Sequence, residues 1–122
     1  MTDAGERPWP TEIRLAGQGK LLRTTFDTGE TFDLSAELLR VESPSAEVKG
    51  HAPDQAVTVP GKRNVSITRI EEVGNYAVRL LFSDGHSTGI YTWDYLLKLG
   101  REREAVWQAY LEKLGAEGLS RD

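Results

Sequence analysis

The segment from Val73 to Trp93 constrains the fold of this chain more than any other part of the sequence. Apolar residues occupy every second position from Tyr76 to Phe82, the pattern of a strand that packs against a core. The polar, glycine-containing stretch 83–86 then indicates a turn, and apolar residues return by Ile90. This segment predicts a strand–turn–strand unit whose first strand lies centrally in an antiparallel sheet.

Earlier parts of the chain carry the same signals. Residues 13–15 alternate as a short first strand, and the glycines in 17–19 predict the turn that follows it. Residues 22–26 alternate again, and the loop 27–30 contains a glycine that can take the positive φ of a hairpin turn. Near residues 65–70 the alternation slips by one position at Ile70, which indicates either a β-bulge or a strand covered on both sides.

Helical signals appear after the first hairpin and after the last strand. Ser35 is a suitable N-cap for a short helix over 36–40, and Thr92 is a suitable N-cap for a helix that Gly100 would end. A last helix is predicted over 101–114, with Gly115 as its stop. Its apolar stripe has the width expected for packing on a core and comprises Val106, Trp107, Tyr110, Leu111 and Leu114.

These elements predict an α+β domain. It has an antiparallel sheet of about five to seven short strands, a short helix after the first hairpin, and two C-terminal helices packed on the sheet. We expect a flexible arm over residues 1–10, one domain over 11–115 and a disordered tail over 116–122, because the tail has little apolar content.

Composition excludes several classes of protein. The formal net charge is -4, which argues against general nucleic-acid binding because phosphate recognition needs a basic surface. No apolar run approaches the length of a membrane span, and the first residues lack the apolar region of a signal peptide. We therefore expect a cytoplasmic protein. With 0 cysteines the chain has no disulfide and no thiolate metal ligand.

Two histidines limit the search for a site. His86 follows a turn glycine, and Asp84 stands two residues earlier, where its carboxylate could either orient the imidazole or cap the turn. His51 lies in a polar loop with Glu47 four residues before it. A metal needs three or four convergent ligands, so zinc or iron is expected only if the fold brings these four side chains together.

Catalytic patterns are absent from the sequence. The serines lack a nucleophile-elbow glycine pattern, and no serine, histidine and acid recur at the spacing of a triad. Gly17-Gln18-Gly19-Lys20 lacks the spacing of a phosphate-binding loop. We expect no catalytic residue, no cofactor and no enzymatic activity.

The tryptophans differ in their predicted surroundings. Trp93 and Trp107 fall on helix faces that turn inward, whereas Trp9 in the arm either anchors that arm or meets a partner. The strand edge at 88–91 and an exposed Trp9 would favour self-association. Either a monomer or a weak homodimer is expected.

Three stretches together resemble a known family: 38–48, 73–77 and 82–93, the last reading Phe-Ser-Asp-Gly-His-Ser-Thr-Gly-Ile-Tyr-Thr-Trp. Over about 10–100 the chain is similar to the gamma-butyrobetaine hydroxylase-like N-terminal domain family. In that family the domain occurs alone in small bacterial proteins, before iron- and 2-oxoglutarate-dependent hydroxylases, and fused to scaffold-type ATPases of iron–sulfur cluster assembly. The separate catalytic domain of the hydroxylases has no counterpart here.

The resemblance also implies a lost zinc site. The hydroxylase version holds a structural zinc with a Cys-Pro-Cys-x-x-Cys segment and a distant histidine, and these positions fall on Ser43, Ser45, Val48 and His86. A hydroxyl is a poor zinc ligand and valine is none. The resemblance therefore implies a vestigial site in which the two serines bond His86 or local backbone, while Val48 joins the core.

The sequence leaves two functional hypotheses. The first is a non-catalytic binding or adaptor domain, whose partner the family links to iron–sulfur assembly ATPases or to oxygenases. The alternative is a metal-binding domain that uses His86 with His51, Glu47 or Asp84.

Overall fold

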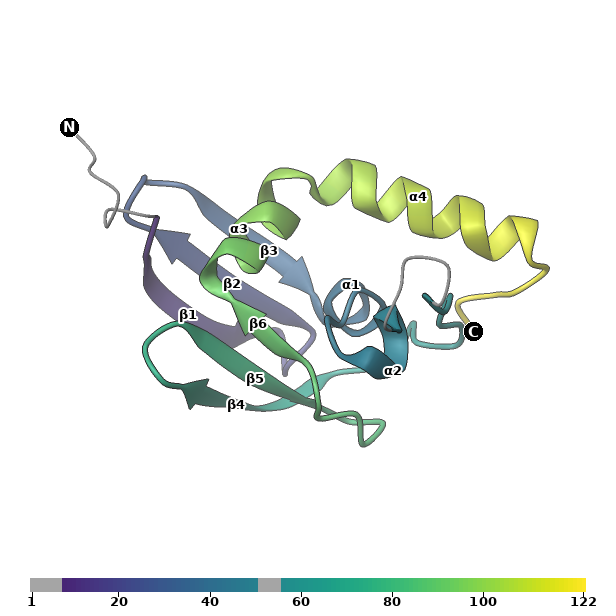
Figure 1. Cartoon of the computed structure of the whole chain (residues 1–122), viewed down its shortest axis with the longest axis horizontal. Coiled ribbons are helices and arrows are strands. Elements are labelled where there is room, and N and C mark those ends of the chain that lie inside the picture. The colour runs from purple at the N-terminus through teal and green to yellow at the C-terminus, as the bar shows by residue number, and fades with distance from the viewer. Residues whose placement is uncertain (1–7, 51–55) are drawn as a thin grey trace.

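The computed structural model of the protein describes residues 8–50 and 56–122 (Figure 1). The predicted α+β class is confirmed, with the C-terminal helices packed on β-structure. The described strands form two three-stranded antiparallel sheets, where the sequence predicts one larger sheet. The split was not visible in the sequence because strand alternation shows which face is buried and not which strands pair.

The first sheet contains the first three strands in sequence order: β1 (Pro10–Ala16), β2 (Leu21–Phe26) and β3 (Thr31–Ser35). Both predicted hairpin turns are present. Gly19 and Gly29 take φ values of 84° and 92°, which glycine adopts without the steric cost that a side chain would bring.

The second sheet contains β4 (Ile67–Val73), β5 (Ala77–Phe82) and β6 (Ile90–Thr92), with β5 at its centre as predicted. The register of β4 against β5 shifts between Ile67 and Arg69, so the β-bulge is present, one of the two alternatives that the sequence left open. It precedes Ile70 and moves that side chain onto the face that packs against the core.

The two sheets meet where the first hairpin turn touches β4. The Ile67 N–H donates to the Gly19 carbonyl over 2.8 Å, and a methyl group on Gly19 would overlap the Ile67 carbonyl. One core joins both sheets and the helices. Its largest fully buried side chains include Leu22, Phe26, Leu34, Leu38, Leu39, Leu80, Tyr91, Leu96 and Leu99.

The predicted N-caps of two helices are confirmed. Ser35 Oγ accepts from the Leu38 N–H over 3.0 Å at the start of α1 (Ala36–Val41). Thr92 Oγ1 accepts from the Tyr95 N–H over 3.2 Å at the start of α3 (Trp93–Arg101). Through these caps each helix begins directly after a strand, and α3 packs against strands of both sheets (Figure 1).

Two glycines do not stop helices as predicted. Gly100 lies inside α3, where it is buried and a methyl group would overlap the ring of Phe32. Its role is to let the helix approach β3 closely. The last helix, α4 (Arg103–Ala116), continues through Gly115 and ends before Gly118, whose φ is 67°.

The apolar stripe of α4 is buried mainly at its C-terminal half. Tyr110 and Leu114 are buried against Val41 of α1, while the other predicted stripe residues are half-buried. Figure 1 shows α4 running beyond the sheets and over α1. Within the described part of the chain, no helix is long and apolar enough to cross a membrane.

The last residues of the arm predicted over 1–10 contact the first sheet. Trp9 is fixed by Asp27, because the Trp9 N–H donates to Asp27 Oδ1 over 3.0 Å and the Asp27 N–H donates to the Trp9 carbonyl over 2.8 Å. Pro10 already belongs to β1. Residues 1–7 lie outside the described part.

The C-terminal residues, predicted to be disordered, make several specific contacts in the structure although most of them are exposed. Gly61 N–H donates to the Ser120 carbonyl over 2.9 Å. Arg121 binds the buried carboxylate of Glu37 through two hydrogen bonds and lies 5.1 Å from the centroid of the Trp107 ring. Composition misses this segment because backbone pairing, an ion pair and a cation–π contact hold it, with little apolar burial.

Candidate functional site

A cluster of buried polar side chains occupies the corner between α1 and the loop after β5. Ser43 follows α1, Ser45 is the N-cap residue of the short helix α2 (Ala46–Lys49), and His86 follows the β5 turn. Ser43 Oγ lies 2.9 Å and Ser45 Oγ lies 3.4 Å from His86 Nε2. We call these three residues the serine–histidine corner. The sequence predicts no helix over the residues that form α2.

Contacts on both sides of the imidazole define its tautomer. His86 Nδ1 lies 3.1 Å from Glu47 Oε1, which can only accept a hydrogen bond while ionised. The ring therefore carries its proton on Nδ1 and accepts at Nε2 from the Ser43 hydroxyl. Ser43 Oγ in turn accepts from the Ser45 N–H over 3.4 Å. Both ring nitrogens are thus used inside the protein.

Burial keeps the imidazole neutral. Desolvation lowers the pKa of His86, and the nearby positive charge of Arg40 lowers it further, while Glu47 and Asp84 oppose the change. A neutral ring matches the hydrogen bonds, since a doubly protonated imidazole could not accept from Ser43. The corner therefore holds an uncharged histidine at neutral pH.

Asp84 does not orient the imidazole. One carboxylate oxygen accepts from the His86 backbone N–H over 3.1 Å, and the other contacts Arg40 Nε at 2.8 Å and Lys62 Nζ at 2.6 Å. Burial alone would raise the pKa of this carboxyl, but the hydrogen bonds from Lys62, His86 and Arg40 hold it well below its usual range. Asp84 therefore caps the turn, and the carboxylate that contacts the ring belongs to Glu47.

The described residues do not fit the zinc that the resemblance implies for this corner. They contain no group of three or more histidine, aspartate or glutamate side chains that could hold a metal ion. The corner offers one imidazole, one carboxylate and two hydroxyls, and Val48 supplies no donor. The Asp84 carboxylate is held by Arg40 and Lys62, and His51 lies outside the described residues.

The corner is closed to ligands. Ser43 has no exposed surface and His86 is 8% exposed. A methyl group on Gly89 would overlap Ser43 Oγ, so the strand entering β6 lies directly against the serine. Because a substrate must reach a reactive group, this geometry supports a structural role for the corner.

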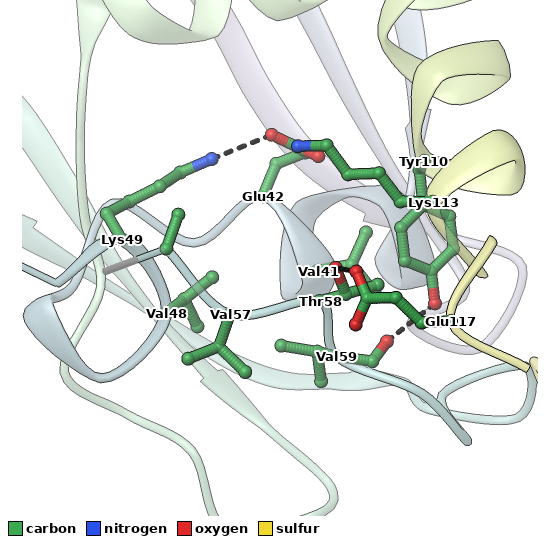
Figure 2. A pocket seen from close by; sticks show the side chains of 11 residues that line it. Val41, Glu42, Val48, Lys49, Val57, Thr58, Val59, Tyr110, Lys113 and Glu117 are labelled. Atoms are coloured by element: carbon green, nitrogen blue, oxygen red, sulfur yellow. Dashed lines mark hydrogen bonds and ion pairs between the residues drawn. The ribbon is translucent and has the colours of Figure 1, made fainter. Parts of the chain in front are cut away.

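A pocket of about 270 Å3 opens beside Val48, between α1, the 56–59 segment and α4 (Figure 2). Valines and Tyr110 form its apolar wall, while two lysines and two glutamates stand at its edge. Several of these charged side chains contact a polar partner. Lys49 Nζ lies 2.8 Å from Glu42 Oε1, and Glu117 accepts a hydrogen bond from the Thr58 hydroxyl over 2.7 Å.

An aromatic surface lies at the other end of the β5 strand. Trp9 and Trp93 pack edge to face with ring centroids 6.4 Å apart, and Tyr76 lies in the turn before β5. Trp9 is 50% exposed and Tyr76 is 52% exposed, whereas Trp93, predicted to turn inward, is half-buried. We call these three residues the aromatic surface. Its components come from distant parts of the sequence, and the sequence singles out only Trp9 as a candidate contact for a partner.

Two hollows of about 340 Å3 each adjoin the aromatic surface. The tryptophan pair lines both of them. The arrangement can bind apolar or planar groups, because half-exposed aromatic rings are the side chains that most often anchor protein partners.

Known proteins place the chain in a family. Residues 13–97 match the family model described as gamma-butyrobetaine hydroxylase-like, N-terminal. No curated protein matches the chain.

Several solved structures are similar to it. Two structures determined by NMR in solution have 43% and 46% identity, TM-scores of 0.80 and 0.81, and coverage of 93% and 99% of this chain and 90% of each of theirs. A crystal structure from Acidithiobacillus ferrooxidans, of a protein of unknown function in the DUF971 family, has 42% identity and a TM-score of 0.62. That match covers 75% of this chain and 91% of the other. The chain therefore belongs to the gamma-butyrobetaine hydroxylase-like N-terminal domain family.

Proposed function

We propose that the protein is a small cytoplasmic, non-catalytic adaptor that binds another protein. The observation that supports this proposal is the aromatic surface. Trp9 and Tyr76 are two of the few large apolar side chains left half-exposed in the described residues. Such side chains on a fixed framework typically anchor a partner, because they bury a large area at a small cost in conformational entropy.

The remaining chemistry of the chain supports binding over catalysis. The imidazole of His86 has both nitrogens in internal hydrogen bonds and lies in a closed corner. The Asp84 carboxylate is bound by Arg40 and Lys62. These groups serve the fold, and among the described residues we favour the exposed aromatic surface as the one used for function.

Family relationships suggest where the partner belongs. The resemblance implies relatives fused to iron–sulfur assembly ATPases or to 2-oxoglutarate-dependent hydroxylases. Fusion of a domain to a protein in some chains favours association of the separate domain with similar proteins in others. We propose a partner from one of these two groups, and we propose that nucleic acid is not bound, given the net charge of -4.

Affinity capture from the native host tests the proposal. The full chain and the double variant Trp9→Ala/Tyr76→Ala are used as bait, with Leu119→Ala as the control because Leu119 is also an exposed apolar residue, at 37%. We expect an iron–sulfur assembly protein or an oxygenase to be enriched by the wild type and the control and lost with the double variant. Enrichment of neither class, or equal recovery with all three baits, would contradict the proposal.

A further inference from the structure

The hollows beside the aromatic surface differ in their walls. The first lies against Tyr76 and Trp93 and has Asn75 and Asp94 at its edge. The second lies between β1 and the second sheet, where Ile13, Ile70 and Val78 supply apolar wall. Because both hollows share the tryptophan pair, one ligand that crosses the pair can place a group in each.

The Trp93 ring and the backbone of Trp9 and Tyr76 are held in place before any partner binds. The Trp93 indole N–H donates to the Asn75 carbonyl over 2.9 Å, and the Trp93 backbone N–H donates to the Tyr76 carbonyl over 3.2 Å. Trp9 is fixed by its two hydrogen bonds with Asp27. The Tyr76 ring lies close over Gly74. A ligand would therefore meet a pre-ordered surface, which lowers the entropic cost of binding.

The charges around the hollows have one sign. All the charged residues among the described lining are acidic: Asp94 in the first hollow, and Glu12 and Glu72 in the second. The pocket beside Val48 differs, because lysines and glutamates both line it. Glu12 lies 3.4 Å from Arg14, but both side chains are half-exposed, so this pair does little to cancel the acidic field. Negative potential and aromatic faces together attract a cation.

We infer that the aromatic surface binds an extended segment of a partner protein that carries an arginine two positions from an aliphatic residue. This inference rests on the proposed adaptor function. The guanidinium occupies the first hollow, against Tyr76 and Trp93, because a planar cation stacks on aromatic rings. The aliphatic side chain occupies the second. Alternate residues of an extended chain point the same way and lie about 7 Å apart, which allows one segment to cross the tryptophan pair.

Peptide titration followed by NMR tests the inference directly. The probe is the acetylated and amidated pentapeptide Gly-Leu-Gly-Arg-Gly, added to the full-length protein labelled with 15N. The indole N–H signals of Trp9 and Trp93 report on the surface, and Trp107, which packs on Tyr110 and beneath Arg121, is an internal control. We expect saturable shifts of the first two signals, with no shift of the third.

Matched peptides isolate the role of the cation. Citrulline replaces arginine with an uncharged side chain of nearly the same shape, and glutamate reverses the charge. We expect at least about tenfold weaker binding for both, and weaker arginine-peptide binding at high salt. Equal affinity for all three peptides, or no shift at about 10 mM arginine peptide, would overturn the inference.

Protein variants locate the binding. Trp9→Ala/Tyr76→Ala is expected to abolish the shift of the Trp93 signal, Glu72→Gln to weaken binding about threefold, and Leu119→Ala to leave it unchanged. Retention of folding is checked by circular dichroism. Unchanged binding in the folded double variant would overturn the assignment of the surface.

Other occupants give distinct results. Residues 1–7 end next to Pro8 at the edge of the first hollow and include Arg7. If a chain beginning at residue 8 bound the peptide more than about tenfold more tightly than the full chain, the surface would belong to its own N-terminal segment. Indole shifts that depend on protein concentration without peptide would assign it to a second copy. Either result overturns the inference of a partner segment.

The peptide and capture experiments can fail separately. Loss of partner capture in the Trp9→Ala/Tyr76→Ala variant, without arginine selectivity in the titration, would leave the adaptor function standing and refute the proposed peptide chemistry. Arginine-selective binding without capture of an iron–sulfur or oxygenase protein would refute the proposed partner class alone.

Discussion

Replacement of Ser43 by alanine is expected to destabilise the protein by about 1–2 kcal/mol. Ser43 is fully buried, and its hydroxyl is the nearest partner of His86 Nε2, at 2.9 Å. A buried acceptor left without a partner costs about 1–3 kcal/mol. The value should fall at the lower end of this range, because Ser45 Oγ already stands 3.4 Å from the same nitrogen and can move closer.

A second substitution separates this hydrogen bond from the loss of packing. Ser43→Ala/Ser45→Ala removes both hydroxyls, and we expect a loss of about 2–3 kcal/mol, more than the sum of the single losses, because neither serine can then replace the other. Ser87→Ala, in the same loop but outside the corner, serves as the control and should change the free energy of unfolding by less than about 0.5 kcal/mol.

Urea denaturation at pH 7.5 measures these differences. Each variant should shift the midpoint while leaving the slope of the transition unchanged, since the surface exposed on unfolding is nearly constant. If Ser43→Ala were as stable as Ser87→Ala and the double variant matched the Ser45→Ala variant, the hydrogen bond from Ser43 to His86 would have no energetic role. The interpretation of the corner as a structural unit would then be refuted.

Four further predictions concern the same structure. Because folding lowers the pKa of His86, the unfolded state takes up a proton first as pH falls below about 6.5, so stability should decrease from pH 7.5 to 5.5. This slope should be smaller in His86→Gln, and an equal slope in urea titrations of both proteins would refute the assignment. Gly100→Ala should lower the melting temperature because its methyl group overlaps the Phe32 ring, whereas Gly115→Ala, on an open helix face, should raise it; the opposite order would contradict the packing of α3. Arg121→Ala should cost about 2–3 kcal/mol in urea unfolding because it leaves the buried Glu37 carboxylate unpaired, and a Glu37→Gln background should reduce that loss; equal losses in both backgrounds would exclude the ion pair. Elemental analysis of purified protein should show no stoichiometric zinc or iron, and metal that disappears in His86→Ala would instead support the metal-binding alternative.

Local signals in the sequence account for most of the fold. The β2–β3 and β5–β6 hairpins follow from alternating apolar residues that flank a turn glycine, and the N-caps at Ser35 and Thr92 follow from a side chain that accepts from a nearby backbone N–H. All of these interactions join residues a few positions apart. A single sequence is informative at that range because the interacting residues lie close together along the chain.

Long-range contacts account for what the sequence did not predict. The junction of the two sheets includes the contact of Gly19 with Ile67, and the C-terminal segment is held by the ion pair of Arg121 with Glu37. Gly100 shows the same limit, since a glycine near the end of a helix resembles a stop unless its contact with Phe32 is known. In each case the deciding partner lies tens of residues away.

The candidate sites follow the same rule. The contact of His86 with Ser43 was implied only by the family resemblance, because the two residues are too far apart in the sequence for any periodicity to pair them. The aromatic surface joins Trp9 to Trp93 across most of the chain, and neither residue's local sequence predicts the other. The sequence also does not predict the exposure of Tyr76, because the alternation that predicts β5 places this residue among the inward positions.

The β5–β6 hairpin explains how the two candidate regions divide their roles. At the end where β5 leads into the turn, His86 is bonded to Ser43 and Glu47, and these contacts join that turn to the segment after α1 as a shared metal would. At the other end Ala77 pairs with Thr92, so the register of the hairpin places Tyr76 beside Trp93. The first end is closed and the second is open. Substitutions in the serine–histidine corner should therefore lower stability while the folded protein still binds its partner. Substitutions in the aromatic surface should instead weaken partner binding while leaving stability nearly unchanged.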